Sequence, residues 1–206
     1  ISELKGKFKN SDDGKALVFT DFLLTGEALR WQGKGQIILP EATNTPWRYF
    51  FEGNQSSLSL TTLDENNIKI DEWSLEGELG PHFDYISFQP LLLKGVATNI
   101  RLGGTIGRHP DFEGLSFSLH ANDMSARDIL AFWPSFVASS VRNYLVQRLQ
   151  IGTVNNFVLD IHFDPSQVKA AFNNQPIADD AMLIKANLSN GQLQADEGLP
   201  LLINLE

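Results

Sequence analysis

The fold is decided by residues 125–164, whose sequence is SARDILAFWPSFVASSVRNYLVQRLQIGTVNNFVLDIHFD. Along this stretch the helical spacing of apolar residues gives way to alternation, and Trp133-Pro134 interrupts the helical part. Proline lacks an amide hydrogen and disfavours helical geometry at the residue before it, yet it suits the first position of a helix. The stretch therefore predicts a helix ending at Trp133, a second helix beginning at Pro134, and a strand after Gly152.

Local signals at the helix ends support this prediction. Ser125 and Asp128 have the spacing of a capping pair, in which the serine oxygen accepts a hydrogen bond from a backbone amide. Gly152 can take the left-handed conformation that ends a helix, and the cation of Arg148 is favourable in a last helical turn. We expect the pair to pack on an apolar surface through Trp133, Pro134, Val137, Val141, Tyr144 and Leu145.

Composition limits the class of protein. The chain has 206 residues, of which 42% are hydrophobic, and this is ample for a core. It has no cysteine, which excludes disulfides, thiolate zinc sites and iron–sulfur clusters. A net charge of -9 and the lack of any Lys/Arg run argue against nucleic-acid binding and against anionic lipid surfaces. No apolar run approaches the roughly 18 residues that cross a bilayer, so we expect no membrane anchor in these residues.

Outside the helix pair, apolar and polar residues alternate between turn signals, as in a sheet with one apolar face. This pattern predicts about ten strands, at 16–24, 28–39, 47–52, 56–63, 68–79, 85–89, 95–102, 114–122, 155–163 and 182–193. Turns are predicted at 12–14, 33–35, 64–67, 80–81 and 103–104. Because many strands are long, the predicted fold is mainly β (α+β), a long curved antiparallel sheet forming a groove with the helix pair packed on or across it.

We expect a single β-rich domain over residues 1–206. Antiparallel strands occupy 1–124, the helix pair 125–151, and further strands 152–206 with a short helix near 166–172. Ile1 is not a start methionine, and residues 1–9 already alternate like a strand. The chain is therefore expected to be a fragment of a larger protein.

Alternation assigns a set of apolar side chains to one face of the predicted sheet. These candidates for the groove lining are Trp73, Leu75, Val96, Ile100, Leu102, Leu115, Phe117, Leu119, Phe157, Leu159, Ile161 and Phe163.

Polar clusters in the chain have simple structural explanations. Asp160, His162 and Asp164 resemble a metal clamp, but the alternation of an exposed strand face accounts for their spacing. The segment HPDFE at 109–113 has the acids of an acid/base pair and no nucleophile beside them. The glycines of 103–107 lack the lysine and the helix of a phosphate loop. We therefore expect no enzymatic activity, no cofactor and no metal site.

Two segments resemble the AsmA-like repeat region of large Gram-negative envelope proteins of the YhdP and TamB type. That family has a Trp-Pro, an Arg about eight residues later, an aromatic residue and a Gly-containing turn before a strand. Here these correspond to Trp133-Pro134, Arg142, Tyr144 and Gly152-Thr153-Val154. Residues 186–205, ANLSNGQLQADEGLPLLINL, resemble the family's strand ending in a Gly-Leu-Pro turn, at Gly198-Leu199-Pro200, with Leu201 where the family usually has a second proline.

The resemblance implies the periplasmic portion of an inner-membrane-anchored protein, a repeating β-groove whose apolar face conducts phospholipids toward the outer membrane. Such a face suits acyl chains, because burial is worth about 0.8 kcal/mol per CH2 group. We therefore expect a non-enzymatic segment that binds or conducts acyl chains, with phospholipids and neighbouring repeats of the parent chain as partners. Two alternatives stay open: a structural or protein-interaction module whose apolar face is filled by its own helix, and a carbohydrate-binding β-sandwich that uses Trp31, Trp47, Trp73 and Trp133.

Overall fold

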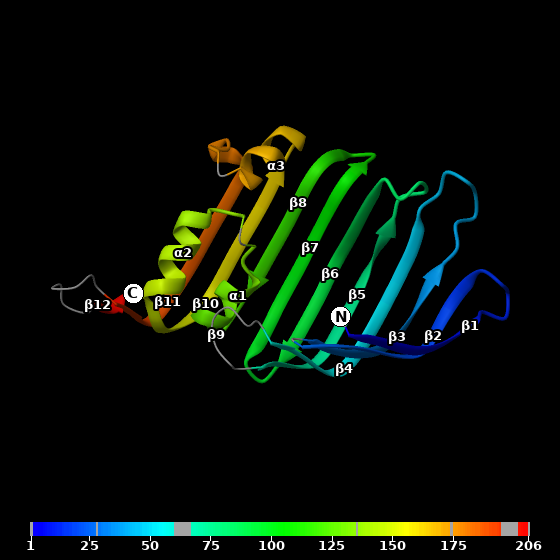
Figure 1. The fold of residues 1–206 in the computed structure, drawn as a ribbon, viewed down its shortest axis with the longest axis horizontal. Helices are drawn as coiled ribbons and strands as arrows, with labels where there is room; N and C mark the ends of the chain where they lie inside the picture. The colour runs from blue at the N-terminus through cyan, green and yellow to red at the C-terminus, as the bar shows by residue number, and fades with distance from the viewer. Residues whose placement is uncertain are drawn as a thin grey trace.

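The computed structural model of this chain describes residues 2–27, 29–59, 67–134, 136–173, 175–194 and 202–205. Within these residues, twelve strands form one antiparallel sheet, accompanied by three α-helices and a short 3-10 helix (Figure 1). The strands follow the order β1-β2-β3-β4-β5-β6-β7-β8-β10-β11-β12, and β9 pairs with β10 beside this path. The sheet is not closed. The predicted class, mainly β with a long curved antiparallel sheet and a helix pair on it, is confirmed.

The elements have the following bounds. The first strands are β1 (Glu3–Asn10), β2 (Ala16–Gly26), β3 (Leu29–Ile38), β4 (Trp47–Ser59), β5 (Asn67–Leu79), β6 (Tyr85–Gly95), β7 (Thr98–His109) and β8 (Phe112–Ala121). The later strands are β9 (Met124–Ser125), β10 (Leu149–Phe163), β11 (Met182–Leu193) and β12 (Leu202–Leu205). The helices are α1 (Ala126–Phe132), α2 (Ser139–Arg148), α3 (Pro165–Phe172) and the 3-10 helix η1 (Asp179–Ala181).

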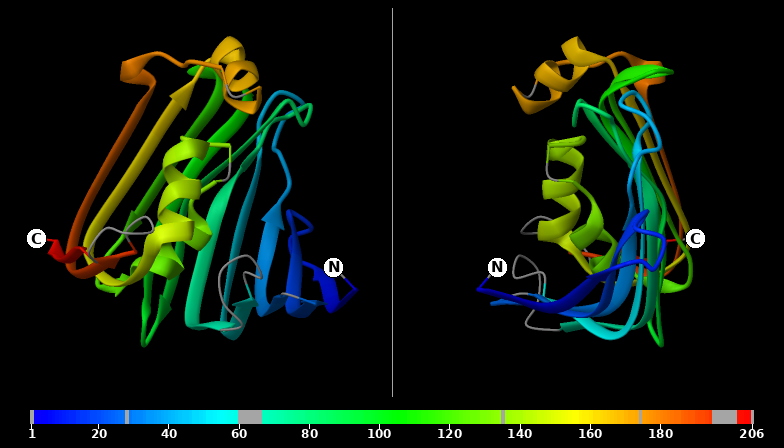
Figure 2. Two further views of the ribbon diagram at one scale, coloured as in Figure 1. Left: turned by 60° about the vertical axis from the view of Figure 1, so that its left-hand side comes forward. Right: turned by 90° about the vertical axis from the view of Figure 1, so that its right-hand side faces the viewer.

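The sheet bends into a trough, and the helices lie on its concave side (Figure 2). Helix α1 contacts β9 and β10, whereas α3 contacts β8 and β10 at the other end of the strands. The strands from β1 to β6 continue the trough beyond the helices (Figures 1 and 2). The concave face is therefore covered by helices over only part of its length.

Strand register aligns the apolar residues of the concave face into rows that cross the sheet. The Leu119 row contains Phe19, Gly35, Phe51, Leu75, Leu91, Leu102, Leu119, Leu159 and Ile184. The Trp73 row contains Gly53, Trp73, Leu93, Ile100, Ala121 and Phe157, and the pair Phe22–Gly33 lies beside it across an irregular part of the β3–β4 ladder. The Phe117 row contains Tyr49, Gly77, Phe88, Gly104, Phe117 and Ile161. Alternation places most of these residues on one face. Register shifts in β2 and β6 add Phe19 with Phe22, and Phe88 with Leu91, although each pair is three residues apart.

Glycines in these rows make room for aromatic rings from the neighbouring strands. A methyl group on Gly53 would lie 2.6 Å from Trp73 Nε1, and one on Gly33 would lie 2.8 Å from Trp73 Cζ2. A methyl group on Gly35 would likewise collide with the ring of Phe51. The concave side of a bent sheet is crowded, so a large ring can lie flat only where its cross-strand neighbour has no side chain.

This packing corrects three sequence predictions. The turns predicted at 33–35 and 103–104 are wrong, because these glycines lie inside β3 and β7. The predicted strands 47–52 and 56–63 are likewise joined through Gly53 into the single strand β4. Glycine here provides space for a ring instead of turning the chain. The turns predicted at 12–14 and 80–81 are confirmed. Two further predictions, the turn at 64–67 and the Gly-Leu-Pro turn at 198–200, fall mostly or wholly outside the described residues.

Both ends of the first helix are confirmed, with Ser125 as its N-cap residue, but the predicted capping hydrogen bond is absent. Trp133 takes extended geometry directly after α1, as expected for a residue before proline. Ser125 makes no capping hydrogen bond through its side chain, because it belongs to β9 and pairs with Thr153 of β10. The helix begins at Ala126, directly after this short ladder.

The second helix begins later than predicted and ends earlier. It starts at Ser139, after a turn in which Ala138 has a left-handed φ of 43°. It ends at Arg148, and β10 begins at once with the buried residue Leu149. Gly152 therefore lies inside a strand, where a methyl group would approach Leu188 Cδ1 to 2.8 Å. Close packing against β11 accounts for this glycine, and the predicted helix stop is wrong.

Candidate apolar groove

The structure separates the predicted groove residues into three groups. Most of them are buried in the core: Trp73, Ile100, Leu102, Leu119, Phe157, Leu159, Ile161 and Phe163. Leu75, Leu115 and Phe117 are half-buried and pack against that core. Val96 is 101% exposed in the turn between β6 and β7, so its assignment to the apolar face is wrong.

The concave face keeps a half-buried apolar surface, which we call the open strip. It consists of Phe51, Leu75, Phe88, Leu91 and Phe117. In the Leu119 row, Phe51 is the cross-strand neighbour of Leu75, which in turn faces Leu91. Phe88 and Phe117 flank Gly104 in the adjacent Phe117 row. The open strip is thus a connected surface running from β4 to β8.

The length of the open strip suits an extended acyl chain. From β4 to β8 there are four steps between neighbouring strands, which at about 4.8 Å each span roughly 19 Å. One acyl chain reaches about half of a hydrocarbon core about 30 Å thick, or roughly 15 Å. A chain laid across the strands would therefore fit on the strip.

Aromatic residues form the floor of the trough on its N-terminal side. The Trp73 indole lies 4.9 Å from that of Trp31 and 6.0 Å from the ring of Phe22, measured between ring centroids. Its Nε1 donates a hydrogen bond to the backbone carbonyl of Gln32 over 3.1 Å. Trp73 is only 4% exposed, so it supports the floor from below the surface.

A set of hydrogen bonds around Trp133 fixes the helical segment over the sheet. Its Nε1 donates to the carbonyl of Val137 over 2.8 Å, and its own carbonyl accepts from Arg142 Nε over 3.0 Å. Trp133 and Val137 are 3% and 0% exposed, and the indole lies 5.8 Å from the ring of Phe157. The prediction that these two residues pack on the apolar face is therefore confirmed.

Of the other four residues predicted to pack in the helix pair, two are half-buried and two are exposed. Leu145 is half-buried against the core, and Pro134 is half-buried in the turn. Val141 and Tyr144 are 52% and 54% exposed, so their predicted packing is wrong. The helix starts at Ser139 instead of Pro134, and α2 contains no fully buried residue. Within α2, Leu145 and Val146 pack against the core.

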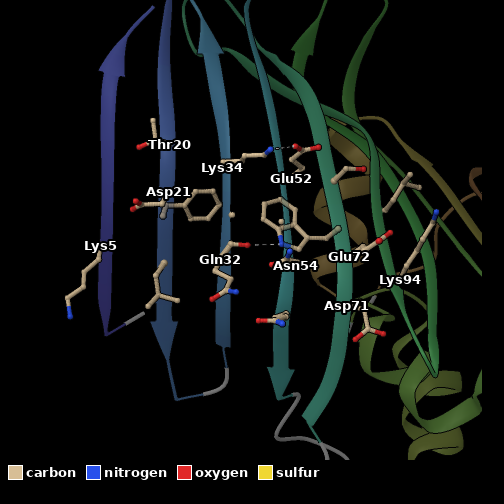
Figure 3. Close-up of a pocket in the computed structure, with 18 residues that line it drawn as sticks. Lys5, Thr20, Asp21, Gln32, Lys34, Glu52, Asn54, Asp71, Glu72 and Lys94 are labelled. Atoms are coloured by element: carbon tan, nitrogen blue, oxygen red, sulfur yellow. Dashed lines mark hydrogen bonds and ion pairs between the residues drawn. The ribbon is translucent and has the colours of Figure 1, made fainter.

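The opposite face of the sheet carries charged and polar side chains. Lys34, Glu52 and Ser74 occupy the positions that alternate with the Trp73 row, so they project to the outer face. They line a polar hollow of about 1090 Å³ together with residues of the neighbouring row such as Gln32, Asn54, Glu72 and Lys94 (Figure 3). Lys34 Nζ and Glu52 Oε1 are 3.0 Å apart in this hollow. Leu23 and Leu92 also line this hollow, so the outer face carries charged pairs beside some apolar residues.

The polar residues singled out in the sequence do not converge. Asp160 lies 3.4 Å from His120 on the outer face, and His162 packs on the ring of Phe112 at 4.0 Å between centroids. Asp164 lies beyond the strand and caps α3, accepting hydrogen bonds from the amides of Ser166 and Gln167. Among the described residues, no group of three His, Cys, Asp or Glu side chains is placed to hold a metal ion.

The tryptophans do not form an exposed stacking platform. Trp73 and Trp133 are 4% and 3% exposed, too little for either indole to stack on a sugar ring. Trp47 is half-buried and stacks on Phe83.

In the part of the chain that the structure describes, no helix has the length and apolar character needed to cross a membrane.

Phe51, Phe88 and Leu91 belong to the open strip and were missing from the sequence-based list. Phe51 and Phe88 each stand beside a glycine of the next strand, Gly35 and Gly104 respectively. A glycine inside an alternating apolar segment was the available signal, and it was assigned to a turn.

No protein-family model, no curated protein and no solved structure matches this chain.

Proposed function

We propose that the concave face binds phospholipid acyl chains, and that the chain is a non-enzymatic segment of an AsmA-like envelope protein located in the periplasm. The observation that carries the proposal is the open strip, a connected apolar surface that the helices leave half-exposed. An unfilled apolar surface is costly in water, and each CH2 group buried on it contributes about 0.8 kcal/mol. Phospholipids and neighbouring repeats of the parent chain are the partners in this proposal.

The separation of chemistry between the two faces supports the same function. Acyl chains would rest on the apolar rows while headgroups stay at the wet rims of the trough. The outer face, with pairs such as Lys34 and Glu52, remains compatible with water. The Trp133 contacts fix the segment between α1 and α2, and α1 itself contacts β9 and β10, so these helices lie toward the C-terminal side of the strip.

A matched pair of neighbouring substitutions tests the proposal. Leu91 belongs to the open strip, whereas Leu92 pairs with Ser74 and Arg101 on the outer face, and both leucines are half-buried. Leu91→Asp places a charge where the acyl chain would lie, so capture of a photo-crosslinkable fatty acid should be lost. Leu92→Asp makes the same chemical change on the other face and should leave capture unchanged. Thermal unfolding of both variants reports whether the fold is kept.

Three outcomes oppose the proposal. Wild-type protein that captures no fatty acid would favour the structural or protein-interaction module, whose apolar face is filled by its own helix. Equal loss of capture in both folded variants would place the ligand elsewhere. If Leu91→Asp unfolds the protein, Leu91→Asn and Leu92→Asn repeat the comparison with a smaller penalty; unchanged capture in the folded Leu91→Asn variant then argues against the strip.

A further inference from the structure

The first strand of the sheet presents an exposed edge with two distinct faces. All of its residues, Glu3–Asn10, are exposed, and among the described residues β1 pairs only with β2. Leu4 and Phe8 are 69% and 68% exposed, although they continue the apolar concave face. Their register partners are Leu24 and Phe19, and the Phe8 and Phe19 rings are 6.2 Å apart. An edge of this length and character is a template for another strand.

The other face of β1 is basic. Lys5, Lys7 and Lys9 alternate with the apolar residues, so they project together to the outer side of the sheet. Lys7 Nζ lies 3.7 Å from Asp21 Oδ2 of β2, and Lys5 Nζ lies 2.8 Å from Glu3 Oε1 of the same strand. Among the described residues Lys9 has no ion-pair partner. This edge is a basic surface on a chain whose net charge is -9.

We propose that β1 binds an extended segment of a partner polypeptide in which apolar and acidic residues alternate. Backbone hydrogen bonds would extend the sheet by one strand, apolar residues of the partner would cover Leu4 and Phe8, and its carboxylates would face the three lysines. Two copies of β1 are a poor match, because antiparallel pairing would set lysines against lysines across the interface. The exposed part of β11 at the other end of the sheet carries Lys185 and is no better as a partner.

Binding of defined peptides to the full chain tests this edge. We would use a fluorescent eight-residue peptide alternating valine with glutamate, one alternating valine with lysine, and a Val/Glu peptide N-methylated at alternate residues. The wild-type chain should bind the first peptide saturably in fluorescence anisotropy and prefer it about tenfold or more over the second. The N-methylated peptide should not bind, because it lacks donors for sheet pairing.

Charge reversal on β1 provides the decisive comparison. The triple variant Lys5→Glu, Lys7→Glu and Lys9→Glu should reverse the preference between the two peptides, whereas Lys185→Glu on β11 should leave it unchanged. No saturable binding, equal binding of both peptides, or an unchanged preference in the triple variant would overturn the proposal. A wild-type dimer in light scattering that Phe8→Glu converts to monomer would also overturn it, since a second copy would then cover the edge. Fatty-acid capture measured alongside shows whether the groove fails independently.

Discussion

Replacing Trp133 should destabilise the protein more than any change on α2. Its indole is 3% exposed, packs on Phe157 and donates a hydrogen bond to the carbonyl of Val137. Truncation of a core tryptophan to alanine costs about 3–5 kcal/mol, because burial is lost and a cavity remains. At about 2–4 °C per kcal/mol for a domain of this size, Trp133→Ala should lower the midpoint of thermal unfolding by roughly 6–20 °C.

A second substitution separates the hydrogen bond from the burial. Trp133→Phe keeps a ring against Phe157 but removes the donor to Val137, whose carbonyl belongs to a fully buried residue. Leaving that acceptor unpaired should cost about 1–3 kcal/mol, less than the alanine variant. Tyr144→Ala serves as the control, because Tyr144 is 54% exposed and should change stability by less than about 0.5 kcal/mol.

Urea unfolding followed by tryptophan fluorescence and circular dichroism gives these free energies. The helical segment would not be anchored through Trp133 if the alanine variant lost less than about 0.5 kcal/mol, the usual range for surface positions. Equal losses in the alanine and phenylalanine variants would show that the hydrogen bond alone, without packing, accounts for the effect.

Three further changes test other parts of the structure. Gly53→Ala brings a methyl carbon against the backbone carbonyl of Gln32 and within 2.6 Å of Trp73 Nε1. We therefore expect a loss of about 1–3 kcal/mol in urea unfolding, and an unchanged midpoint would contradict the close packing around Gly53. Burial raises the pKa of Tyr49 from 10.0 to about 12, so its contribution to stability is complete below pH 10 and is lost as the pH rises towards 12. Tyr49→Phe should remove this alkaline dependence from thermal melts. Hydrogen bonds, led by that from the Ser166 hydroxyl, hold the pKa of Asp164 below its usual value. The contribution of Asp164 to folding stability is therefore present above the usual carboxyl pKa, and it is lost as the pH falls through the lowered pKa of the folded state. Asp164→Asn keeps a capping acceptor and should flatten this acid dependence; a profile identical to wild type would argue against the cap.

Alternation and the helical spacing of apolar residues made much of the fold predictable. The strand β11 lies where its alternation placed it, at Met182–Leu193, and α3 begins one residue before the predicted start. Both predictions used local sequence patterns: apolar–polar alternation for the strand, and the helical spacing of Val168, Ala171 and Phe172 after Pro165 for the helix. Such signals lie within a few residues and can be read without the tertiary structure.

Long-range contacts decided what the sequence could not reveal. Gly53 and Gly104 lie in strands because rings from neighbouring strands occupy the space above them. The start of α2 depends on the Trp133 indole, which engages the carbonyl of Val137 and favours a turn after Pro134. The division of the apolar face into a covered core and an open strip also depends on where the helices pack. Alternation identifies the residues that share one face of the sheet, but it does not show which of them remain accessible to solvent or ligand.

The central claim is that acyl chains lie on the open strip, and mapping a photo-crosslinked fatty acid onto the chain tests it most directly. Wild-type protein would be irradiated with a diazirine fatty acid, and the adducts located by peptide mass spectrometry. Our account predicts adducts at Phe51, Leu75, Phe88, Leu91 and Phe117, and none at Leu92 or around Lys34 and Glu52. Adducts confined to the outer face, or no adduct at all, would contradict it.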